Sequence, residues 1–441
     1  MAEFKKGTRI PTVTGNEIEI VEKLGEGGQG VVYKVRHDGK LRALKWYFPG
    51  KLQDEAAFIK NLENNINNGA PTKAFLWPLE LTEYVDGSFG YVMELRPQEY
   101  KDFSRFLLAR EHIKSIDALI NAALCITNAF RALHAKGYSY QDLNDGNFFI
   151  NPNTGDVLIC DNDNVAPYGK SLGIAGKCRY MAPEVVTHKK LPDVFTDRFS
   201  LGVVLYMLLC LNHPLEGKRT LCPCMTEELE YKFFGTDPVF VYDPDNDTNR
   251  PVPGVHINEL MLWKFYPKFI KDMFCKAFSR KAMVGEQNEI AQTRPIDDDW
   301  EDLFIALKNA SVKCNSCGET TMIDLDGGNR PICLNCGKPV KRLPILTIKN
   351  NRVNHRVILA KGKTLHPCHI VKGSRDYEED LAEVITSKMD PNIIGLKNLS
   401  ENTWNITNAN GETRQFEKGK TIQLLPGLKI AFNNDMIGEV N

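Results

Sequence analysis

The stretch Tyr138-Ser139-Tyr140-Gln141-Asp142-Leu143-Asn144-Asp145-Gly146-Asn147 places a carboxylate, Asp142, five residues before a carboxamide, Asn147. Fourteen residues later, after the apolar run 157–160, a second carboxylate follows at Asp161. A base for a hydroxyl proton and two oxygen ligands for Mg²⁺ are the groups that ATP-dependent phosphoryl transfer needs at one point in space. The spacing therefore predicts a phosphoryl-transfer site.

A glycine-rich segment precedes this loop. Gly25, Gly27 and Gly30 follow the pattern Gly-x-Gly-x-x-Gly, and glycines let backbone N–H groups approach phosphate oxygens. Dinucleotide-binding folds share the spacing, but in those folds a helix follows the glycines. Here the run 31–35 is β-branched and strand-like, so we expect the glycines to form a hairpin over a nucleotide.

Lys45 lies in the apolar run 43–46, fifteen residues after the last of these glycines. A lysine inside an apolar strand is costly unless its ammonium is paired. We expect it to contact nucleotide phosphates and a carboxylate of the helix predicted for 53–66, with Glu63 as the first candidate and Glu55 as the second. A lysine that extends to solvent is the commoner case for a strand, but the glycines upstream favour pairing.

Three later segments extend the pattern. Met181-Ala182-Pro183-Glu184 is typical of the end of an activation segment, and Asp197-Arg198-Phe199-Ser200-Leu201-Gly202 of the start of a buried central helix. Arg294-Pro295 is typical of a late arginine that pairs with Glu184. Together with the glycines, the lysine and the Asp142 loop, these segments resemble the eukaryotic-type protein kinase family from about residue 17 to residue 307.

The resemblance implies an α+β, bilobal kinase fold. A protein kinase domain would occupy residues 1–310, with a β-rich N-lobe over 17–95 and an α-helical C-lobe over 96–310. It also implies an enzyme that transfers the γ-phosphoryl group of ATP to Ser or Thr hydroxyls of proteins. The alternative is a pseudokinase scaffold that binds a nucleotide and partners without catalysis.

The resemblance carries the family's roles onto the matching positions. Asp142 would accept or orient the substrate hydroxyl proton, while Asn147 and Asp161 would hold Mg²⁺ or Mn²⁺. Lys45 would contact the α- and β-phosphates, and Glu63 would hold it. The residues implied to contact ATP are Leu24, Gly25, Gly27, Gly30, Val32, Ala43, Lys45, Met93, Glu94, Leu95, Arg96, Asn147 and Asp161.

Two departures in and near the loop bear on activity. Gln141 replaces the arginine that neutralises an activation-segment phosphate, and glutamine is uncharged. Because Ser171 is the only Ser or Thr between Asp161 and Glu184, we predict activity without phosphorylation of that segment. Asn144 replaces a lysine that stabilises charge on the transferred phosphoryl group, so we expect slower chemistry unless another cation, such as Lys177, or a second metal ion substitutes. Alternatively, Asn144 only shapes the loop.

A third departure is Asp161-Asn162-Asp163, which stands where the family has Asp-Phe-Gly. Asn162 removes an aromatic side chain and Tyr140 adds one, so we hypothesise a compensating exchange of size. Asp163 is either a further metal ligand, favouring Mn²⁺ or a second Mg²⁺, or the cap of a turn. We favour the cap, the usual role of an Asp in a polar loop.

A cysteine quartet follows the kinase-like region. The two Cys-x-x-Cys pairs are separated by fifteen residues and each is followed by a glycine; they are Cys314, Cys317, Cys333 and Cys336. This spacing predicts a tetrahedral Zn²⁺ site in a zinc ribbon over 311–344, since a redox dithiol needs only one pair. Four thiolates leave no open coordination position, so the metal would be structural.

The C-terminal region, 345–441, consists of short β-like runs separated by turn pairs, which predicts a small all-β sandwich. Runs such as 395–399 and 425–432 weakly resemble a forkhead-associated domain. We expect protein contact or intramolecular docking rather than phosphopeptide recognition. The three parts together resemble bacterial kinases of the tellurite-resistance phosphorylation triad, which implies a metal-dependent phosphatase and a von Willebrand A-like protein as partners.

The whole chain of 441 residues suggests about three domains. Its formal net charge of −1 predicts neither nucleic acid nor a membrane as partner. The polar residues 1–9 predict no signal peptide, and the longest apolar run, 201–211, is too short to span a bilayer. Twelve cysteines without an export signal indicate a reducing, cytoplasmic setting.

Overall fold

The computed structural model describes residues 3–170, 176–327, 331–341, 343–349, 353–390 and 392–441. Contacts divide the chain into two compact units. The first contains residues 1–114, 121–264 and 272–298, and the second contains 115–120, 265–271 and 299–441. Ser171, the single candidate phosphosite of the activation segment, lies outside the described residues.

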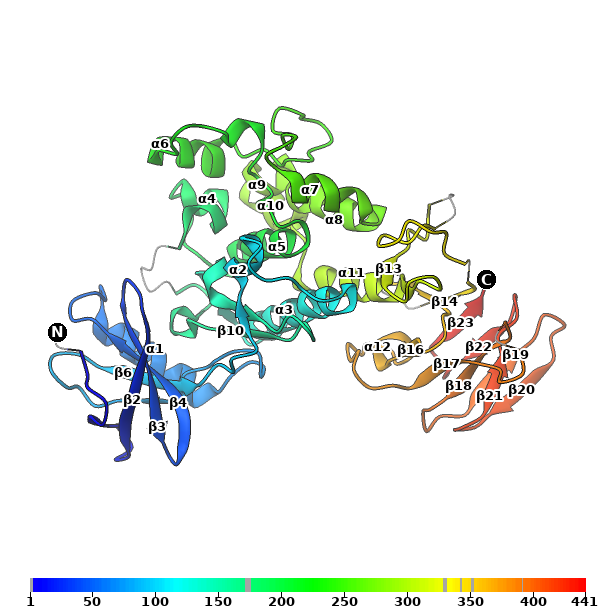
Figure 1. Cartoon of the computed structure of the whole chain (residues 1–441), viewed down its shortest axis with the longest axis horizontal. Helices are drawn as coiled ribbons and strands as arrows, with labels where there is room; N and C mark the ends of the chain where they lie inside the picture. The colour runs from blue at the N-terminus through cyan, green and yellow to red at the C-terminus, as the bar shows by residue number, and fades with distance from the viewer. Residues whose placement is uncertain (1–2, 171–175, 328–330, 342, 350–352, 391) are drawn as a thin grey trace. The chain divides into compact units, whose positions relative to one another are not determined.

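The N-terminal part of the first unit is a six-stranded antiparallel sheet (Figure 1). Its order is β1-β2-β3-β4-β6-β5, with bounds Arg9–Pro11, Glu17–Glu26, Gly30–His37, Lys40–Tyr47, Gly90–Glu94 and Glu80–Leu81. The sheet therefore begins before residue 17, the start expected from the sequence, because β1 pairs with β2. Register places Val32 of β3 opposite Lys45 of β4, so the two side chains project from the same face of the sheet.

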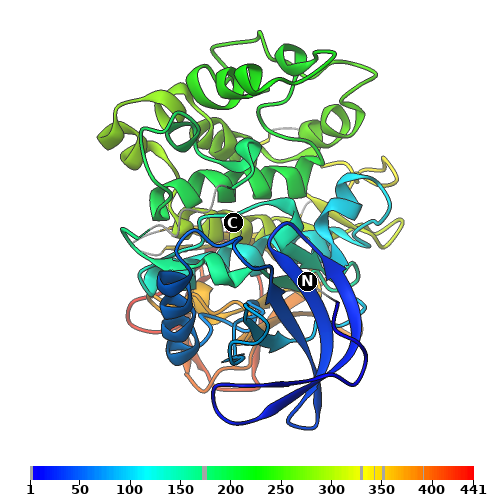
Figure 2. The ribbon, with the colours of Figure 1, turned by 90° about the vertical axis from the view of Figure 1, so that its left-hand side faces the viewer.

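Helix α1, Glu55–Asn68, packs beside this sheet (Figure 2). The Asp54 side chain accepts a hydrogen bond from the Ala57 backbone N–H, and the helix ends at Gly69 with φ of 66°. Phe58 and Leu62 of α1 share a buried cluster with strand residues of β6. Apolar burial on one helical stripe therefore fixes which face of α1 looks inward.

The rest of the first unit is mainly helical, with short strands around the predicted loop. The helices are α2 Phe103–Leu107, α3 Ile116–Ala135, α4 Pro183–Val186, α5 Val194–Cys210, α6 Glu227–Glu230, α7 Ile257–Leu262, α8 Lys268–Ala277, α9 Arg280–Val284 and α10 Gln287–Thr293. The strands are β7 Lys101–Asp102, β8 Tyr138–Ser139, β9 Phe148–Ile150, β10 Val157–Ile159 and β11 Ala166–Pro167. A β-rich lobe followed by a helical lobe is the two-lobed arrangement that the sequence predicts.

Two long helices form the core of the helical lobe. Nearly all of α5 is buried, and Asp193 caps its N-terminus in a capping box with Thr196. Among the described residues, α3 has the length and apolar composition of a membrane span. Leu124, Ile126 and Phe130 of α3 are fully buried within the fold, which is how a core helix buries its apolar faces.

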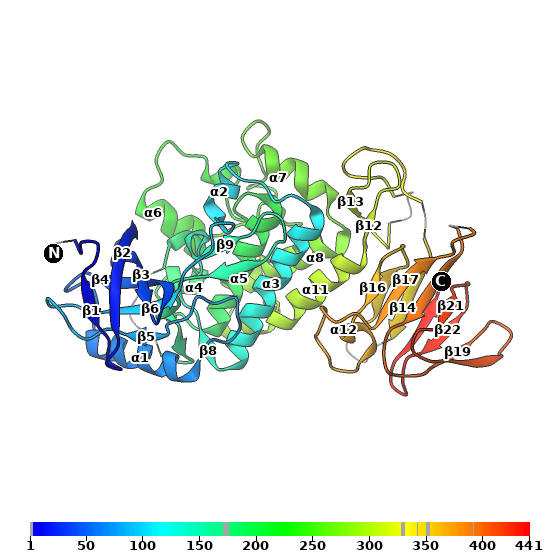
Figure 3. The ribbon, with the colours of Figure 1, turned by 60° about the horizontal axis from the view of Figure 1, so that its bottom comes forward.

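The second unit includes most of α11, Asp297–Asn309, and a two-stranded sheet of β12 Ser311–Lys313 and β13 Thr320–Met322. Two further antiparallel sheets follow, drawn in orange and red in Figure 3. One has the order β15-β14-β23-β22-β19-β20, with bounds His355–Ile358, Ile345–Lys349, Ile437–Val440, Lys429–Ala431, Trp404–Thr407 and Thr413–Phe416. The other has the order β16-β17-β18-β21, with bounds Thr364–Leu365, Ala382–Thr386, Ile394–Asn398 and Thr421–Gln423.

The two larger sheets share one hydrophobic core. Leu346 and Trp404 of the first sheet lie in the same buried cluster as Val384 and Leu396 of the second. A short helix, α12 Pro367–Ile370, adds Ile370 to this core. Alternating inward and outward residues explain the pattern of short β runs between turn pairs in the sequence.

Candidate active site

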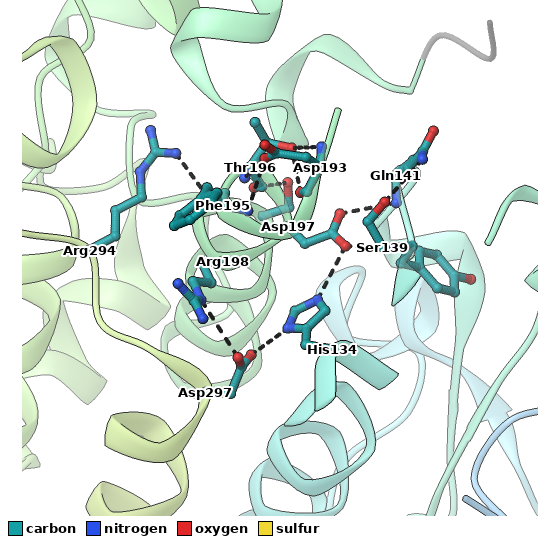
Figure 4. Close-up of polar contacts among 12 residues, drawn as sticks. His134, Ser139, Gln141, Asp193, Phe195, Thr196, Asp197, Arg198, Arg294 and Asp297 are labelled. Atoms are coloured by element: carbon teal, nitrogen blue, oxygen red, sulfur yellow. Dashed lines mark hydrogen bonds and ion pairs between the residues drawn. The ribbon is translucent and has the colours of Figure 1, made fainter. Parts of the chain in front are cut away.

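The loop that carries Asp142 is anchored by one buried carboxylate of α5. Asp197 accepts hydrogen bonds from the backbone N–H groups of Tyr140 at 2.6 Å and Gln141 at 3.0 Å (Figure 4). Gln141 adopts a left-handed backbone conformation with φ of 70°. The two amides point to the same carboxylate, so Asp197 holds the turn that presents Asp142.

His134, which also contacts Asp297, holds the Asp197 carboxylate in place. The His134 ring lies between two carboxylates, with Nε2 3.2 Å from Asp197 and Nδ1 2.7 Å from Asp297 (Figure 4). Burial alone would lower the pKa of His134, but hydrogen bonds to the two carboxylates raise it to about 9. The imidazolium therefore donates from both ring nitrogens at neutral pH and keeps Asp197 in place.

The Asp142 carboxylate is held by its close neighbours in the chain. Asn144 Nδ2 donates to Asp142 Oδ1 at 3.1 Å, and its own Oδ1 accepts from the Gly146 backbone N–H at 3.0 Å. Burial raises the pKa of Asp142 to about 6, a rise that the Asn144 bond opposes and the nearby Asp161 carboxylate supports. Asn144 thus shapes the loop, as one of the two alternatives requires, and also bonds directly to the carboxylate.

The two predicted metal ligands are Asn147, at the end of this loop, and Asp161, which lies close to it. Asn147 Nδ2 donates to the Asp142 backbone oxygen at 2.7 Å, which leaves the Asn147 side-chain oxygen as a ligand atom. The Cys160 N–H donates to the Asn147 backbone oxygen at 2.9 Å, so the β9–β10 hairpin returns Asp161 to the loop. Asp161 has φ of 53°, and 43% of its side chain is exposed. A carboxylate and an amide oxygen are a donor set that suits Mg²⁺ or Mn²⁺.

Lys45 reaches the same place from the sheet. Its ammonium lies 2.7 Å from Asp163 Oδ2 and 3.4 Å from Asp161 Oδ1, and 8% of its side chain is exposed. The Tyr47 hydroxyl also donates to Asp163. Burial would lower the pKa of Lys45, but the two carboxylates outweigh it and raise the pKa, so the ammonium stays charged. Asp163 therefore pairs with the Lys45 ammonium, a role that the sequence did not predict for it, and its role as a metal ligand stays a prediction.

The structure corrects the prediction that Glu63 holds Lys45. Glu63 Oε2 lies 3.3 Å from Lys60 Nζ on the same helix, and 46% of its side chain is exposed. The second candidate, Glu55, accepts a hydrogen bond from Tyr84. Neither acid of α1 lies on the buried stripe of the helix.

The burial pattern of α1 explains this correction. The buried residues of α1 follow the spacing i, i+3, i+4, i+7 and are Phe58, Asn61, Leu62 and Asn65. Glu63 is two residues from Asn61, which is about 200° around a helix of 3.6 residues per turn. The inward polar residues are therefore the carboxamides of Asn61 and Asn65, and both donate to the Val165 backbone oxygen, at 2.8 and 2.9 Å.

An apolar cluster lies on the strand side of the site. Ala43 and Met93 are buried in it, and the partly buried Val32, Leu95 and Leu158 pack against them. Leu158 of β10 was not predicted as a site residue, although its position between Asn147 and Asp161 points to it.

The glycine-rich turn has two kinds of glycine. Among the described residues, a Cβ on Gly25 or Gly27 would meet nothing within 4 Å, so the backbone there borders open space. A Cβ on Gly30 would lie 2.1 Å from the Trp46 backbone oxygen. Strand packing therefore requires Gly30, while Gly25 and Gly27 leave room for a ligand. Leu24 beside them is 49% exposed.

The structure shows the contacts of the other residues that bear on the departures from the kinase family's pattern. Gln141 Nε2 donates to the Lys170 backbone oxygen at 2.6 Å, so this glutamine bonds the chain just before Ser171. Lys177 Nζ lies 3.0 Å from Asp145 in the loop. Tyr140 is fully buried, and its hydroxyl donates to the Cys160 backbone oxygen.

Asn162 is also fully buried, and it donates to the backbone oxygens of Leu76 and Ile159 at 2.8 and 2.9 Å. The exchange of size between Tyr140 and Asn162 is compatible with these positions and stays a hypothesis. The predicted pair of Glu184 and Arg294 is confirmed, because two hydrogen bonds of 2.7 and 2.8 Å join the buried side chains.

The four predicted zinc ligands come together in the second unit. Their sulfur atoms all lie within 4.8 Å of one another. Backbone N–H groups of Ser316 and Cys317 lower the pKa of Cys314, which favours its thiolate. Gly318 and Gly337 have φ of 76° and 69° and close the two turns. The donor set fits a tetrahedral metal ion with thiolate ligands.

Comparison with known proteins agrees with this geometry. Residues 18–231 match the family model described as protein kinase domain. The chain is 24% identical over 235 residues to serine/threonine-protein kinase Nek11 of Macaca fascicularis, covering 48% of this chain and 34% of that protein. It is 26% identical over 211 residues to serine/threonine-protein kinase pim-2 of Danio rerio, covering 44% of this chain and 67% of that protein.

A third relative, the probable serine/threonine-protein kinase MARK-C of Dictyostelium discoideum, is 35% identical over 116 residues, 25% of this chain and 15% of that protein. The matches thus span between about a seventh and two thirds of these relatives' lengths. The matched part of the chain is the part that contains the glycine-rich turn, Lys45 and the Asp142 loop. Residues 18–231 of this chain are therefore similar to protein kinase domains, and the relatives they match are serine/threonine-protein kinases.

Proposed function

We propose that this chain transfers the γ-phosphoryl group of ATP to Ser or Thr hydroxyls of protein substrates. The observation that carries the proposal is the convergence of Lys45, Asp142, Asn147 and Asp161, which are spread over 117 sequence positions (45–161), around one polar site. These are the charged and ligand groups that phosphoryl transfer requires.

In this proposal, Asp142 orients the substrate hydroxyl and accepts its proton. A pKa of about 6 brings the carboxylate closer to the operating pH than a free Asp, which helps a general base. Asn147 and Asp161 hold Mg²⁺ or Mn²⁺, and the bound metal neutralises charge on the β- and γ-phosphates. Lys45 contacts the α- and β-phosphates with its buried ammonium.

Binding of ATP is assigned to groups of both lobes. The backbone of Gly25 and Gly27 borders the phosphates, and the apolar cluster of Val32, Ala43 and Leu158 packs on the adenine ring. The other residues proposed to contact ATP are Leu24, Gly30, Met93, Glu94, Leu95 and Arg96. Arg96 stacks its guanidinium on Phe149, 4.1 Å from the ring centre, which orders the segment that follows β6.

The cation that would replace the missing lysine is Lys177. Its ammonium is bonded to Asp145, three residues from Asp142, and 54% of its side chain is exposed. An exposed lysine beside the loop can stabilise charge on the transferred group. A second metal ion is the alternative source of positive charge.

We further propose that the kinase does not depend on phosphorylation of its own activation segment. Support comes from Gln141, whose carboxamide bonds the backbone of Lys170. An uncharged side chain engaged in this way offers a segment phosphate no counter-charge.

The test is incubation of the purified chain with labelled ATP and Mg²⁺ or Mn²⁺, beside an Asp142→Asn variant. Transfer to itself or to a generic protein substrate by the intact chain, and not by the variant, supports the kinase. Nucleotide binding without transfer from either protein supports the pseudokinase scaffold instead. Asn144 favours that alternative, because it puts a neutral side chain where transfer usually uses a cation.

The C-terminal parts carry proposals of their own. Residues 311–344 would form a zinc ribbon with structural Zn²⁺ on Cys314, Cys317, Cys333 and Cys336, tested by metal analysis of the chain beside a Cys333→Ser variant. Residues 345–441 would be a forkhead-associated-like module for protein contact. A cytoplasmic bacterial signalling role, with a metal-dependent phosphatase and a von Willebrand A-like protein as partners, extends the resemblance noted in the sequence.

A further inference from the structure

The nearest carboxylate to the Lys45 ammonium comes from the segment that follows Asp161. Asp163 is fully buried, its Oδ2 lies 2.7 Å from Lys45 Nζ, and the Tyr47 hydroxyl donates to the same oxygen. Its other oxygen, Oδ1, is buried without a hydrogen-bond partner among the described residues. Such a carboxylate is costly to bury, and the attraction of a close, buried ammonium is what offsets the cost.

Helix α1 contacts the same segment without using charge. Asn61 and Asn65 both donate to the Val165 backbone oxygen, two residues beyond Asp163. The acids of α1, Glu55 and Glu63, bond Tyr84 and Lys60 instead. Helix and lysine are therefore both attached to residues 161–165, and the lysine does not depend on a carboxylate of the helix.

We propose that Asp163 is the positioning residue for Lys45 in the phosphoryl-transfer site. This inference rests on the proposed kinase function. Asp163 holds the ammonium within reach of Asp161, so that the lysine and the metal ligand of the same short segment are set together. The position of the Lys45 ammonium then depends on the conformation of residues 161–165. It does not depend on whether α1 lies in an inward or an outward position.

The experiment compares Asp163→Asn with Glu63→Gln, a matched removal of one carboxylate charge. Steady-state kinetics with ATP as the varied substrate and calorimetric binding of Mg²⁺–ATP are measured for each protein. We expect Asp163→Asn to lose about 10- to 100-fold in kcat/KM for ATP, the cost of a misplaced contact group, while Glu63→Gln stays within about two-fold. Equal losses in both variants, or wild-type kinetics for folded Asp163→Asn, would overturn the proposal.

A conservative variant separates positioning from mere packing. Asp163→Glu keeps a carboxylate on the segment that follows Asp161. We expect it to retain more of the ATP affinity than Asp163→Asn, since the ammonium keeps a charged partner. A folded Asp163→Glu protein with the same loss as Asp163→Asn contradicts the inference.

Folding and the kinase proposal are controlled separately. If Asp163→Asn alone does not fold, a Lys45→Met/Asp163→Asn variant removes both charges. Recovery of folding there shows that Asp163 and Lys45 act as a pair, whereas continued failure to fold overturns the proposal in favour of a packing role. If the wild-type chain transfers no phosphate, the kinase proposal fails, while calorimetric Mg²⁺–ATP binding by the same variants still tests the role of Asp163.

Discussion

In the loop around Asp142, polar side chains bond near neighbours in the chain, whereas Lys45 is held by groups from a distant segment. Asn144 and Asn147 bond Asp142 over two and five residues, while Lys45 and Asp163 are 118 residues apart. The loop also has one distant anchor, Asp197, some 56 residues away. Sequence spacing therefore predicts which side chains bond within the loop. Packing of the two lobes decides which carboxylate pairs with Lys45.

The largest expected effect tests the local side of this comparison. Asp142→Asn keeps the hydrogen-bonding shape of the side chain but removes the base, so we expect phosphoryl transfer to fall about 10²- to 10⁴-fold. Labelled-ATP transfer measures the rate, and a thermal melt close to that of the wild type serves as the control. A folded variant with more than a third of wild-type activity would show that Asp142 is not the base.

The next prediction removes the distant anchor of the loop. Asp197→Ala leaves the Tyr140 and Gln141 amides without their acceptor and His134 without one of its two carboxylates, so we expect a loss of about 3–5 kcal/mol in the free energy of unfolding. Denaturant unfolding measures it. The exposed Asp245→Ala is the matched control, and a similar small loss in both would mean that the loop holds its own shape.

The free energy of unfolding should depend on pH through His134, which contacts Asp197. The folded pKa of His134, about 9, lies above the unfolded value near 6.5, so its stabilising contribution is complete below about pH 6.5 and is lost as the pH rises through 9. A shift of this size corresponds to at most about 3 kcal/mol. Unfolding free energies between pH 6 and 9.5 should decline less in a His134→Gln variant; parallel curves for the two proteins would contradict the assignment.

A smaller effect tests the cation beside the loop. We expect Lys177→Ala to lower kcat about 10-fold with little change in the KM for ATP, because the exposed ammonium acts on the transferred group rather than on binding. Steady-state kinetics with Lys189→Ala, an exposed lysine of the same region, provide the control. Unchanged kcat in Lys177→Ala would assign that charge to a second metal ion.

The smallest expected effect concerns the activation segment. Ser171→Ala should leave kcat and KM within about two-fold of the wild type, since Gln141 offers a phosphate no counter-charge. Activity of the two proteins after phosphatase treatment is the measurement. A large loss of activity in folded Ser171→Ala would contradict this prediction, because it would show that activity depends on this serine of the activation segment.

Most of the candidate site was predictable where its residues are close in sequence or lie on one strand. The Asp142 and Asn147 pair, Asp161 after its strand, and the pair of Cys-x-x-Cys motifs all come together as their spacing indicates. The Glu184–Arg294 pair, 110 residues apart, was predictable only through the resemblance. The Glu63 prediction was wrong because the extent of a helix does not show which of its faces lies inward, and the inward face of α1 carries Asn61 and Asn65.

The sequence alone therefore determined which chemical groups the site contains, because a turn or a strand end fixes the relation of residues a few positions apart. It also determined the two-lobed order of β-rich and helical regions, through the periods of their apolar residues. Only the tertiary structure decided that Asp163 rather than Glu63 pairs with Lys45. The reason is physical: a buried ammonium takes the carboxylate that packing leaves in the interior with it, and Asp163 is buried while Glu63 faces solvent.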